Sequence, residues 1–313
     1  MEEQRINTKK KSKKWLWITL SIVGAILLGT SAYVYSIYYS VESAAKEMYE
    51  APTKKKSEKR IEQVEFTQKD PISVLIMGVD ERTNDVGRSD TLIAMTVNPE
   101  KQSMQMVSIP RDTRTEIIGK GFDDKINHAY AFGGTDMAID TVENFLDIPI
   151  DYYIKVNMES FKEIVDAVGG VTVTNPFSFT EGGYTFNEGQ INLNGEQALS
   201  YSRMRYQDPR GDFGRQDRQK QIIMGVIQKG ASFSSLGKHG EILNVLGENI
   251  KTNLSFDQMI DIQANYQEAR HNLEQFQVNG SGATINKIYY YVVPEEERIN
   301  LSTKLKDHLA LTN

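Results

Sequence analysis

The feature that most constrains this chain is an uncharged segment near its N-terminus. Trp15 to Tyr39 comprises 25 residues without a charged side chain. As an α-helix rising about 1.5 Å per residue it would be roughly 37 Å long, enough to cross a hydrocarbon core of roughly 30 Å. Tryptophans lie at one end and tyrosines at the other, where amphipathic rings favour the membrane interface. We therefore expect a transmembrane helix over residues 15–39.

The charges around this segment predict its orientation. Residues 1–14 contain six Lys or Arg and two Glu, a local charge of +4. Because basic flanks remain in the cytoplasm, we expect residues 1–14 to form a cytoplasmic tail and the later residues to lie outside, a single-pass type II topology. A cleaved signal peptide is the alternative. Its apolar core would be shorter and would end in a small-x-small site, of which Thr30-Ser31-Ala32 is a poor version. We therefore favour an uncleaved signal anchor.

After the anchor, composition predicts a spacer and one domain. Residues 40–70 are dense in charge and sparse in apolar side chains, which is typical of a spacer. The remaining 243 residues, 71–313, are enough for one sizeable core. The chain has no cysteine and only four histidines, none within five residues of another, which excludes disulfides, cysteine-ligated metals and H-E-x-x-H zinc sites. The whole chain carries a net charge of −6, so no nucleic-acid partner is expected.

Short apolar runs and helical periodicities alternate through residues 71–313. Ile72–Val79 is a nearly continuous apolar run, typical of a strand buried on both faces. Residues 91–97 and 103–109 predict an antiparallel pair. Further strands are expected over 152–156, 171–174 and 288–293, and helices over about 135–146, 161–168, 194–202, 216–229 and 255–270. The elements predict an α/β domain with a central mixed β-sheet and helices on both faces.

Arginine and aspartate gather in three places, and the richest is residues 203–218. This segment has five Arg and no Lys, although Lys outnumbers Arg 23 to 13 in the chain. The guanidinium is a planar fork suited to phosphate. A solvated face of Arg–Asp pairs is the alternative. The alternation Arg203-Met204-Arg205 favours phosphate, because it can place both guanidiniums on one side of an extended chain.

The other two clusters flank predicted strands. Asp80 follows the first strand and Asp90 precedes the next, with a glycine-containing loop between them. Two such carboxylates could hold one Mg²⁺, or could pair with Arg82 and Arg88 and order the loop. The third cluster, Arg111-Asp112-Thr113-Arg114, follows a strand and would alone be a charged turn. Together the clusters predict a site for a phosphate ester with a metal, without a histidine nucleophile.

These motifs resemble the LytR–CpsA–Psr (LCP) family, and within it the wall teichoic acid ligases. The matching segments span most of residues 71–220 in the family's order. They are Gly78–Arg82, Gly87–Thr91, Ser108–Thr113, Lys125–Tyr130, Val165–Val171, Leu193–Leu199, Arg203-x-Arg205, and the run from Gly211 to Gln219.

The resemblance implies a phosphotransferase that moves a phosphate-linked glycopolymer, wall teichoic acid, from an undecaprenyl-pyrophosphate carrier to a peptidoglycan sugar hydroxyl. It implies Asp80 and Asp90 as ligands of Mg²⁺, for which Mn²⁺ could substitute, and Arg111, Asp90 and Arg203 as catalytic residues. The implied pyrophosphate ligands are Arg88, Arg111, Arg203, Arg205, Arg215, Arg218 and Gln219. It further implies an apolar channel for the polyprenyl tail beside the sheet.

Two alternatives remain open on the sequence. A pyrophosphatase or phosphodiesterase would use the same site with water as the acceptor. A membrane-tethered regulator would bind polyprenyl phosphate without chemistry.

Overall fold

The computed structural model describes residues 14–51, 53–54, 56–81, 87–157, 160–230 and 239–311. The first 13 residues of the predicted cytoplasmic tail lie outside these ranges, as does Arg82.

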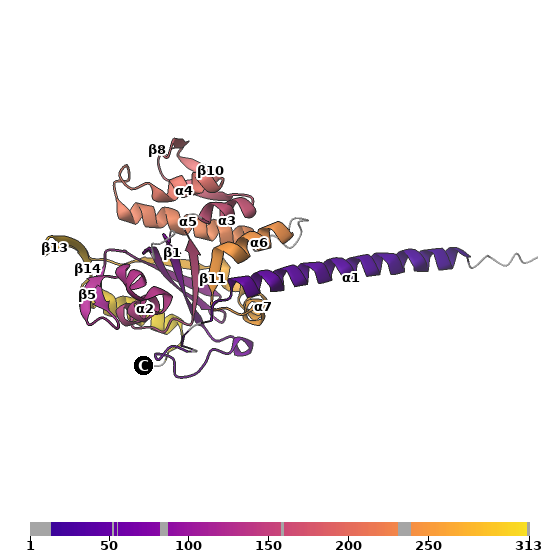
Figure 1. Ribbon diagram of the computed structural model, residues 1–313, viewed down its shortest axis with the longest axis horizontal. Helices are drawn as coiled ribbons and strands as arrows, with labels where there is room; N and C mark the ends of the chain where they lie inside the picture. The colour runs from indigo at the N-terminus through magenta and orange to yellow at the C-terminus, as the bar shows by residue number, and fades with distance from the viewer. Residues whose placement is uncertain are drawn as a thin grey trace, which may run out of the picture.

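A long helix, α1 (Lys14–Met48), leads into the domain (Figure 1). Its segment Trp17–Met48 is long and apolar enough to cross a membrane, as predicted, and no described part of the chain buries its most apolar stretch. The last turns of α1 pack on the domain instead: Ala44 and Ala45 are buried, and the rings of Tyr38 and Phe256 meet at 5.3 Å.

The predicted spacer over residues 40–70 belongs largely to folded structure, which corrects that boundary. Residues 40–48 continue α1. Phe66 is buried between the rings of Tyr152 and Tyr266, each 5.7 Å away. Arg60 forms an ion pair of 2.7 Å with Asp151 in which both side chains are at least nine-tenths buried. The domain therefore includes residues before Pro71, because Phe66 packs in its core and Arg60 pairs with the buried carboxylate of Asp151.

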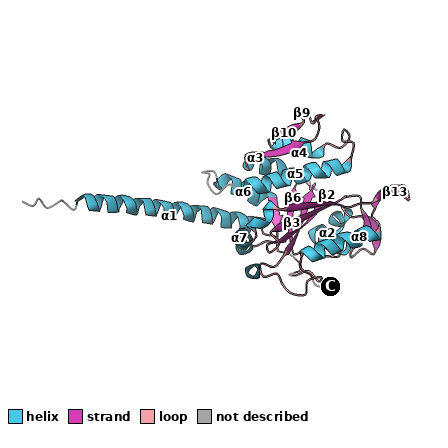
Figure 2. Ribbon diagram, turned by 180° about the vertical axis from the view of Figure 1, so that it is seen from behind, coloured by secondary structure: helices cyan, strands magenta, loops and turns pink. Residues whose placement is uncertain are grey.

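The centre of the domain is a mixed six-stranded sheet in the order β11-β6-β1-β2-β3-β12 (Figure 2). The pairs β1–β2, β2–β3 and β11–β6 are antiparallel, whereas β1–β6 and β3–β12 are parallel. The bounds are β1 (Ile72–Val79), β2 (Ser89–Asn98), β3 (Ser103–Ile109), β6 (Tyr152–Asn157), β11 (Ile250–Thr252) and β12 (Leu273–Gln277).

Helices cover both faces of this sheet, as the sequence predicts. Because side chains alternate along a strand, Leu75, Met77 and Val79 pack with α2 (His128–Leu146) and α8 (Glu295–His308). Val74 and Ile76 face the other way, toward α5 (Asp212–Gly230), α7 (Phe256–Asn265) and the 3₁₀ helices Phe66–Gln68 and Gln267–His271.

A third hydrophobic cluster is formed by the elements that are drawn above the sheet in Figure 1. It joins α5 to α3 (Phe161–Ala167), α4 (Gly195–Arg203) and short strands. These strands are β7 (Val171–Asn175), β8 (Phe179–Glu181), β9 (Tyr184–Phe186) and β10 (Gly189–Leu193). The remaining elements are α6 (His239–Asn249) and the hairpins β4 (Arg114–Ile117)–β5 (Phe122–Lys125) and β13 (Ser281–Ile285)–β14 (Ile288–Val292).

Two predicted helices differ in their bounds. Helix α2 begins at His128, before the predicted start near residue 135, because its first turns precede a kink at Gly133 and Gly134 that interrupts the periodicity. Helix α7 starts as predicted, with a capping box at Ser255, but it ends at Asn265 and a separate 3₁₀ helix follows.

Candidate active site

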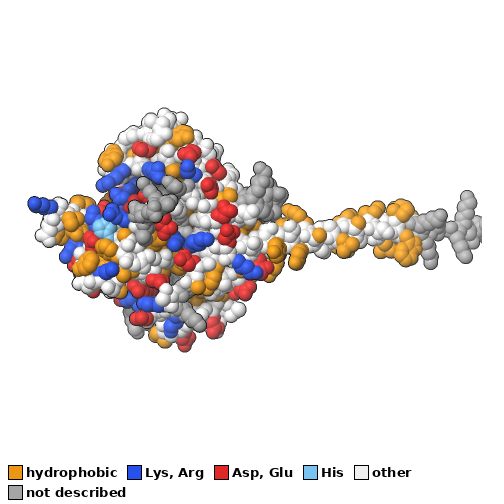
Figure 3. Space-filling model, in the orientation of Figure 1, with side chains coloured by type: hydrophobic (Ala, Val, Ile, Leu, Met, Phe, Trp, Pro, Cys, Tyr) orange, Lys and Arg blue, Asp and Glu red, His pale blue; other side chains and the backbone are white. Residues whose placement is uncertain are grey.

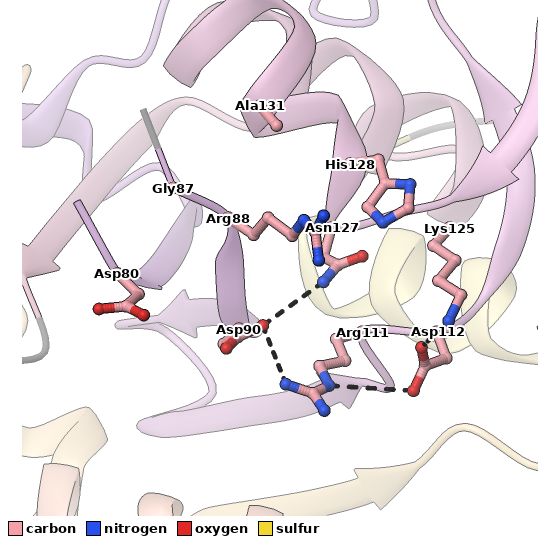
Figure 4. A pocket seen from close by; sticks show the side chains of 10 residues that line it. All are labelled: Asp80, Gly87, Arg88, Asp90, Arg111, Asp112, Lys125, Asn127, His128 and Ala131. Carbon is pink, nitrogen blue, oxygen red and sulfur yellow. Dashed lines mark hydrogen bonds and ion pairs between the residues drawn. The ribbon is translucent and has the colours of Figure 1, made fainter. Parts of the chain in front are cut away.

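Three strands of the sheet deliver polar residues to one edge. Asp80 follows the end of β1, Asp90 lies at the start of β2, and Arg111 follows the end of β3. Because β2 runs antiparallel to β1 and β3, these three positions meet. They line a pocket of about 450 Å³ (Figure 4). Its complete lining is Asp80, Gly87, Arg88, Asp90, Arg111, Asp112, Lys125, Asn127, His128 and Ala131.

Arg111 is the centre of the contacts in this pocket. Its Nη1 lies 3.0 Å from Asp90 Oδ1, and its Nε lies 3.9 Å from Asp112 Oδ2. Lys125 Nζ lies 2.6 Å from Asp112 Oδ1, and Asn127 Nδ2 donates to Asp90 Oδ1 at 3.4 Å. Burial opposes the charge on Arg111, but Asp90 and Asp112 outweigh it and raise the pKa of the guanidinium. The structure thus joins two of the predicted clusters into one.

Asp80 and Asp90 both line the pocket, which suits the predicted Mg²⁺ site (Figure 4). The described residues contain no group of three or more His, Cys, Asp or Glu placed to hold a metal. Two carboxylates nevertheless fit Mg²⁺, which takes one or two from the protein and completes its octahedron with water and phosphate oxygens. Gly87 permits the loop between them: its φ is +71°, and a Cβ there would lie 2.1 Å from the Asp80 carbonyl oxygen.

The arginine-rich segment 203–218 also approaches this edge, through Arg215 and Arg205. Arg215 Nη2 lies 2.5 Å from Asp212 Oδ1, and Arg205 Nε lies 4.0 Å from the same oxygen. Burial lowers the pKa of Arg215, and the positive charges of Arg111 and Arg205 lower it further. The negative charges of Asp212 and Asp90 oppose this shift but do not cancel it. Arg215 Nε is buried and has no hydrogen-bond partner within the described ranges. A buried, crowded guanidinium with an unused donor is suited to an incoming anion.

Arg203 lies at the end of α4 and is exposed. It makes no ion pair with any described residue, so its charge is available to a ligand. The prediction that Arg203-x-Arg205 is an extended segment is wrong at its first residue. Arg203 is helical, and the chain becomes extended only at Met204, where φ is −57° and ψ is 131°.

Arg218 does not lie where the sequence predicted. Its side chain is 1% exposed, and its Nη1 contacts Asp208 Oδ2 at 2.6 Å. Its Nη2 donates to the Met204 carbonyl oxygen at 2.5 Å, and the guanidinium stacks on the rings of Phe179 and Tyr201. A buried and paired guanidinium cannot reach pyrophosphate without breaking these contacts. The prediction of Arg218 as a pyrophosphate ligand is therefore wrong, and its role is structural.

A second, apolar cavity of about 190 Å³ adjoins the same strand ends. Gly78 and Thr91, neighbours of the two acidic residues, line it, and Gln219 and Ser202 supply polar groups. The rest of its wall comes mostly from apolar side chains of β6, α3 and α5, namely Ile154, Val156, Phe161, Ile164, Ile223, Val226 and Ile227. Gln219, a predicted pyrophosphate ligand, therefore lines the apolar cavity and not the polar pocket. The wall residues on α5 had been indistinguishable from core in the sequence.

The sequence analysis missed three polar residues of the pocket, Lys125, Asn127 and His128. It excluded histidine from the clusters, whereas His128 lines the pocket, with its Nδ1 2.8 Å from Asp124 Oδ2. Despite partial burial, hydrogen bonds from His128 and the Lys125 amide lower the pKa of Asp124. The sequence did contain a signal for these residues, because the Lys125–Tyr130 segment is one of those that match the family. No role in the site was assigned to it.

A polar pocket that contains Arg88 and Arg111 thus lies beside an apolar cavity at the ends of β1 and β2. The LytR_cpsA_psr family model matches residues 34–307, and the chain belongs to that family. It is similar to the polyisoprenyl-teichoic acid–peptidoglycan teichoic acid transferase TagU of Bacillus subtilis (strain 168), with 54% identity over 97% of this chain and 99% of that protein.

Solved structures agree with the fold. The crystal structure of B. subtilis TagU superposes with a TM-score of 0.65 at 54% identity, over 78% of this chain and 99% of that one. A structure of TagT bound to LI-WTA gives a TM-score of 0.71 at 30% identity, over 83% and 99% of the two chains.

Proposed function

We propose that this chain is a transferase that moves wall teichoic acid from an undecaprenyl-pyrophosphate carrier to a sugar hydroxyl of peptidoglycan. The observation that carries the proposal is the adjacency of the polar pocket, which Arg88 and Arg111 help to line, and the apolar cavity at the ends of β1 and β2. A lipid pyrophosphate needs both surfaces at once, one for its charge and one for its tail. The relatives named as teichoic acid transferases support the same activity.

The chemistry would proceed by displacement at the phosphorus that carries the polymer. The acceptor oxygen forms a bond to this phosphorus, and the bond to the bridging oxygen breaks. The products are a phosphodiester and polyprenyl phosphate. The acceptor hydroxyl gives its proton to a pocket carboxylate; Asp80, Asp90 and Asp112 are the candidates.

The arginines would stabilise the charge that develops on the leaving phosphate. Arg111 is already oriented by Asp90 and Asp112, and Arg215 by Asp212, so neither reorganises during the reaction. Arg88, Arg203 and Arg205 would complete the grip on the pyrophosphate. Mg²⁺ bound by Asp80 and Asp90 would neutralise charge on the phosphate oxygens.

We further propose a type II topology with the domain outside the cell, supported by the basic tail and the apolar helix. The domain end of α1 lies against β11, which supplies Ile250 to the apolar cavity. The cavity therefore lies on the side of the domain from which a membrane-embedded tail would arrive. A C-terminal tag should be cleaved by protease added to intact protoplasts, and a protected tag would contradict this topology.

A product assay tests the activity. The full chain in nanodiscs is incubated with lipid-pyrophosphate-linked teichoic acid, a glycan strand and Mg²⁺, and the products are analysed by mass spectrometry. Transfer yields polymer joined to glycan through a phosphodiester. Arg111→Ala should lower the rate on the order of a hundredfold, the scale of losing a transition-state charge donor. The matched control is Arg210→Ala, which removes an exposed ion pair with Asp217 outside the pocket. Free, hydrolysed polymer as the only product would indicate a hydrolase, and no turnover a binding protein.

A further inference from the structure

Three aromatic rings form an exposed corner beside the active-site pocket. Phe122 on β5 and Phe132 on α2 are 47% and 40% exposed, and their centroids lie 5.9 Å apart at an interplanar angle of 77°. His128 meets Phe132 at 6.0 Å and 75°. We call these three residues the aromatic platform. Exposed large apolar side chains with a polar rim indicate an interaction surface.

The platform is continuous with the pocket, because His128 belongs to both. Its polar rim includes Lys120, whose Nζ lies 5.7 Å from the Phe132 ring centroid, and Asp124, which contacts His128. Arg114 and Asp123 form a further ion pair of 2.8 Å on the same hairpin. Rings and charges are therefore interleaved over a few residues, which suits a ligand that is both amphipathic and hydroxylated.

The position of the platform argues against a membrane as its partner. Figure 1 shows β5 at the end of the domain opposite the one where α1 enters, with α2 between β5 and the sheet. Helix α1 packs on α6, β11 and α7 and makes no comparable contact with β5. In Figure 3 hydrophobic side chains gather at this same distal end, far from the apolar helix. A lipid tail arrives at the other side of the sheet edge, where the apolar cavity lies.

We propose that the aromatic platform binds the sugar rings of the acceptor glycan strand and so directs its hydroxyl into the pocket; this rests on the proposed transferase function. The C–H face of a pyranose is weakly positive and packs on the negative face of an aromatic ring. Lys120, Asp123 and the Asp124–His128 pair supply hydrogen bonds to hydroxyl groups at the ring edges. Donor and acceptor then approach the phosphorus from opposite ends of the domain.

Binding of the acceptor alone tests this assignment. The full chain in nanodiscs is titrated with a defined, uncrosslinked peptidoglycan glycan strand in the absence of donor. Phe132→Leu keeps an apolar side chain but removes the ring, and Phe132→Trp keeps a ring. We expect Phe132→Leu to raise the Kd for the strand about tenfold, equivalent to about 1.4 kcal/mol, and Phe132→Trp to restore it. Ile299→Ala removes an apolar side chain that is 57% exposed on α8 and serves as the control.

Steady-state transfer gives the second readout. Phe132→Leu and Phe122→Leu should raise the KM for the glycan while leaving the affinity for lipid-pyrophosphate donor unchanged. Melting curves confirm that both variants fold. Wild-type affinity for the strand in both variants would overturn the platform while leaving the proposed transfer intact. A wild-type chain that transfers no polymer to the glycan would instead refute the proposed function. A loss of affinity in Phe132→Leu that Phe132→Trp does not recover would also overturn the sugar assignment.

Discussion

Replacing Arg218 should lower the stability of the domain, because its side chain is buried and paired and does not contact the substrate. The side chains of Arg218 and Asp208 are 1% and 0% exposed and meet at 2.6 Å. Arg218→Ala leaves the buried Asp208 carboxylate with only the half-exposed Arg210, whose Nε lies 3.7 Å from Asp208 Oδ1, and loss of a buried partner typically costs about 3–5 kcal/mol. For a domain of this size each kcal/mol shifts the Tm by about 2–4 °C, so we expect a decrease of about 6–20 °C.

Thermal unfolding of the full chain followed by circular dichroism measures this effect. Arg114→Ala is the matched control, because Arg114 pairs with Asp123 at 2.8 Å while both side chains are 38% exposed, and it should contribute less than about 1 kcal/mol. The double variant Arg218→Met, Asp208→Leu should recover much of the stability, since it buries no unpaired charge. An unchanged Tm in Arg218→Ala, with lost affinity for pyrophosphate, would refute the structural role.

The same pair predicts a pH dependence. Although burial opposes it, the hydrogen bond from Arg218 lowers the pKa of Asp208 below its usual 3.8. A carboxylate with a depressed folded-state pKa stabilises the fold above the unfolded pKa and loses that contribution as the pH falls through the folded one. The wild-type chain should therefore lose this contribution below about pH 4. Arg218→Ala should have a flatter dependence there, and parallel curves would contradict the assignment.

Three further predictions concern other residues. Burial lowers the pKa of His308 to about 4. The free energy of unfolding should therefore decrease by about 3 kcal/mol as the pH falls from about 6.5 to 4. In His308→Gln, the free energy measured by urea unfolding should depend less on pH over this range. Arg111→Lys should recover little of the transfer rate lost in Arg111→Ala, since an ammonium cannot span the carboxylates of Asp90 and Asp112 while holding phosphate; a rate near wild type would contradict this. Asp80→Asn should weaken the Mg²⁺ dependence of donor binding in calorimetry without changing the Tm, and an unchanged dependence would remove Asp80 from the metal site.

The sheet and its flanking helices were predictable because their signals are local. The apolar run Ile72–Val79 is buried at every position, as strands covered on both faces are. The capping boxes at Asn194 and Ser255 begin α4 and α7 where the sequence places them. The beginning of α2 was less predictable, because the kink at Gly133 interrupts its periodicity.

The division of labour among arginines was not predictable, because burial is a tertiary property. Arg215 and Arg218 are one helical turn apart and look alike in the sequence. The first meets Asp212 beside the pocket, whereas the second points into a cluster of aromatic rings and Asp208. His128 was missed for the same reason: only the folded β4–β5 hairpin and the start of α2 bring it beside Arg111.

The central claim is that one lipid pyrophosphate occupies both the polar pocket and the apolar cavity. Its most direct test is the Kd of the full chain for polyprenyl pyrophosphates of increasing tail length. We predict that affinity rises over the first few isoprene units, that Ile227→Trp abolishes this gain by filling the cavity, and that Arg111→Ala weakens every member equally. An affinity independent of tail length, or one that Ile227→Trp leaves unchanged, would contradict the claim.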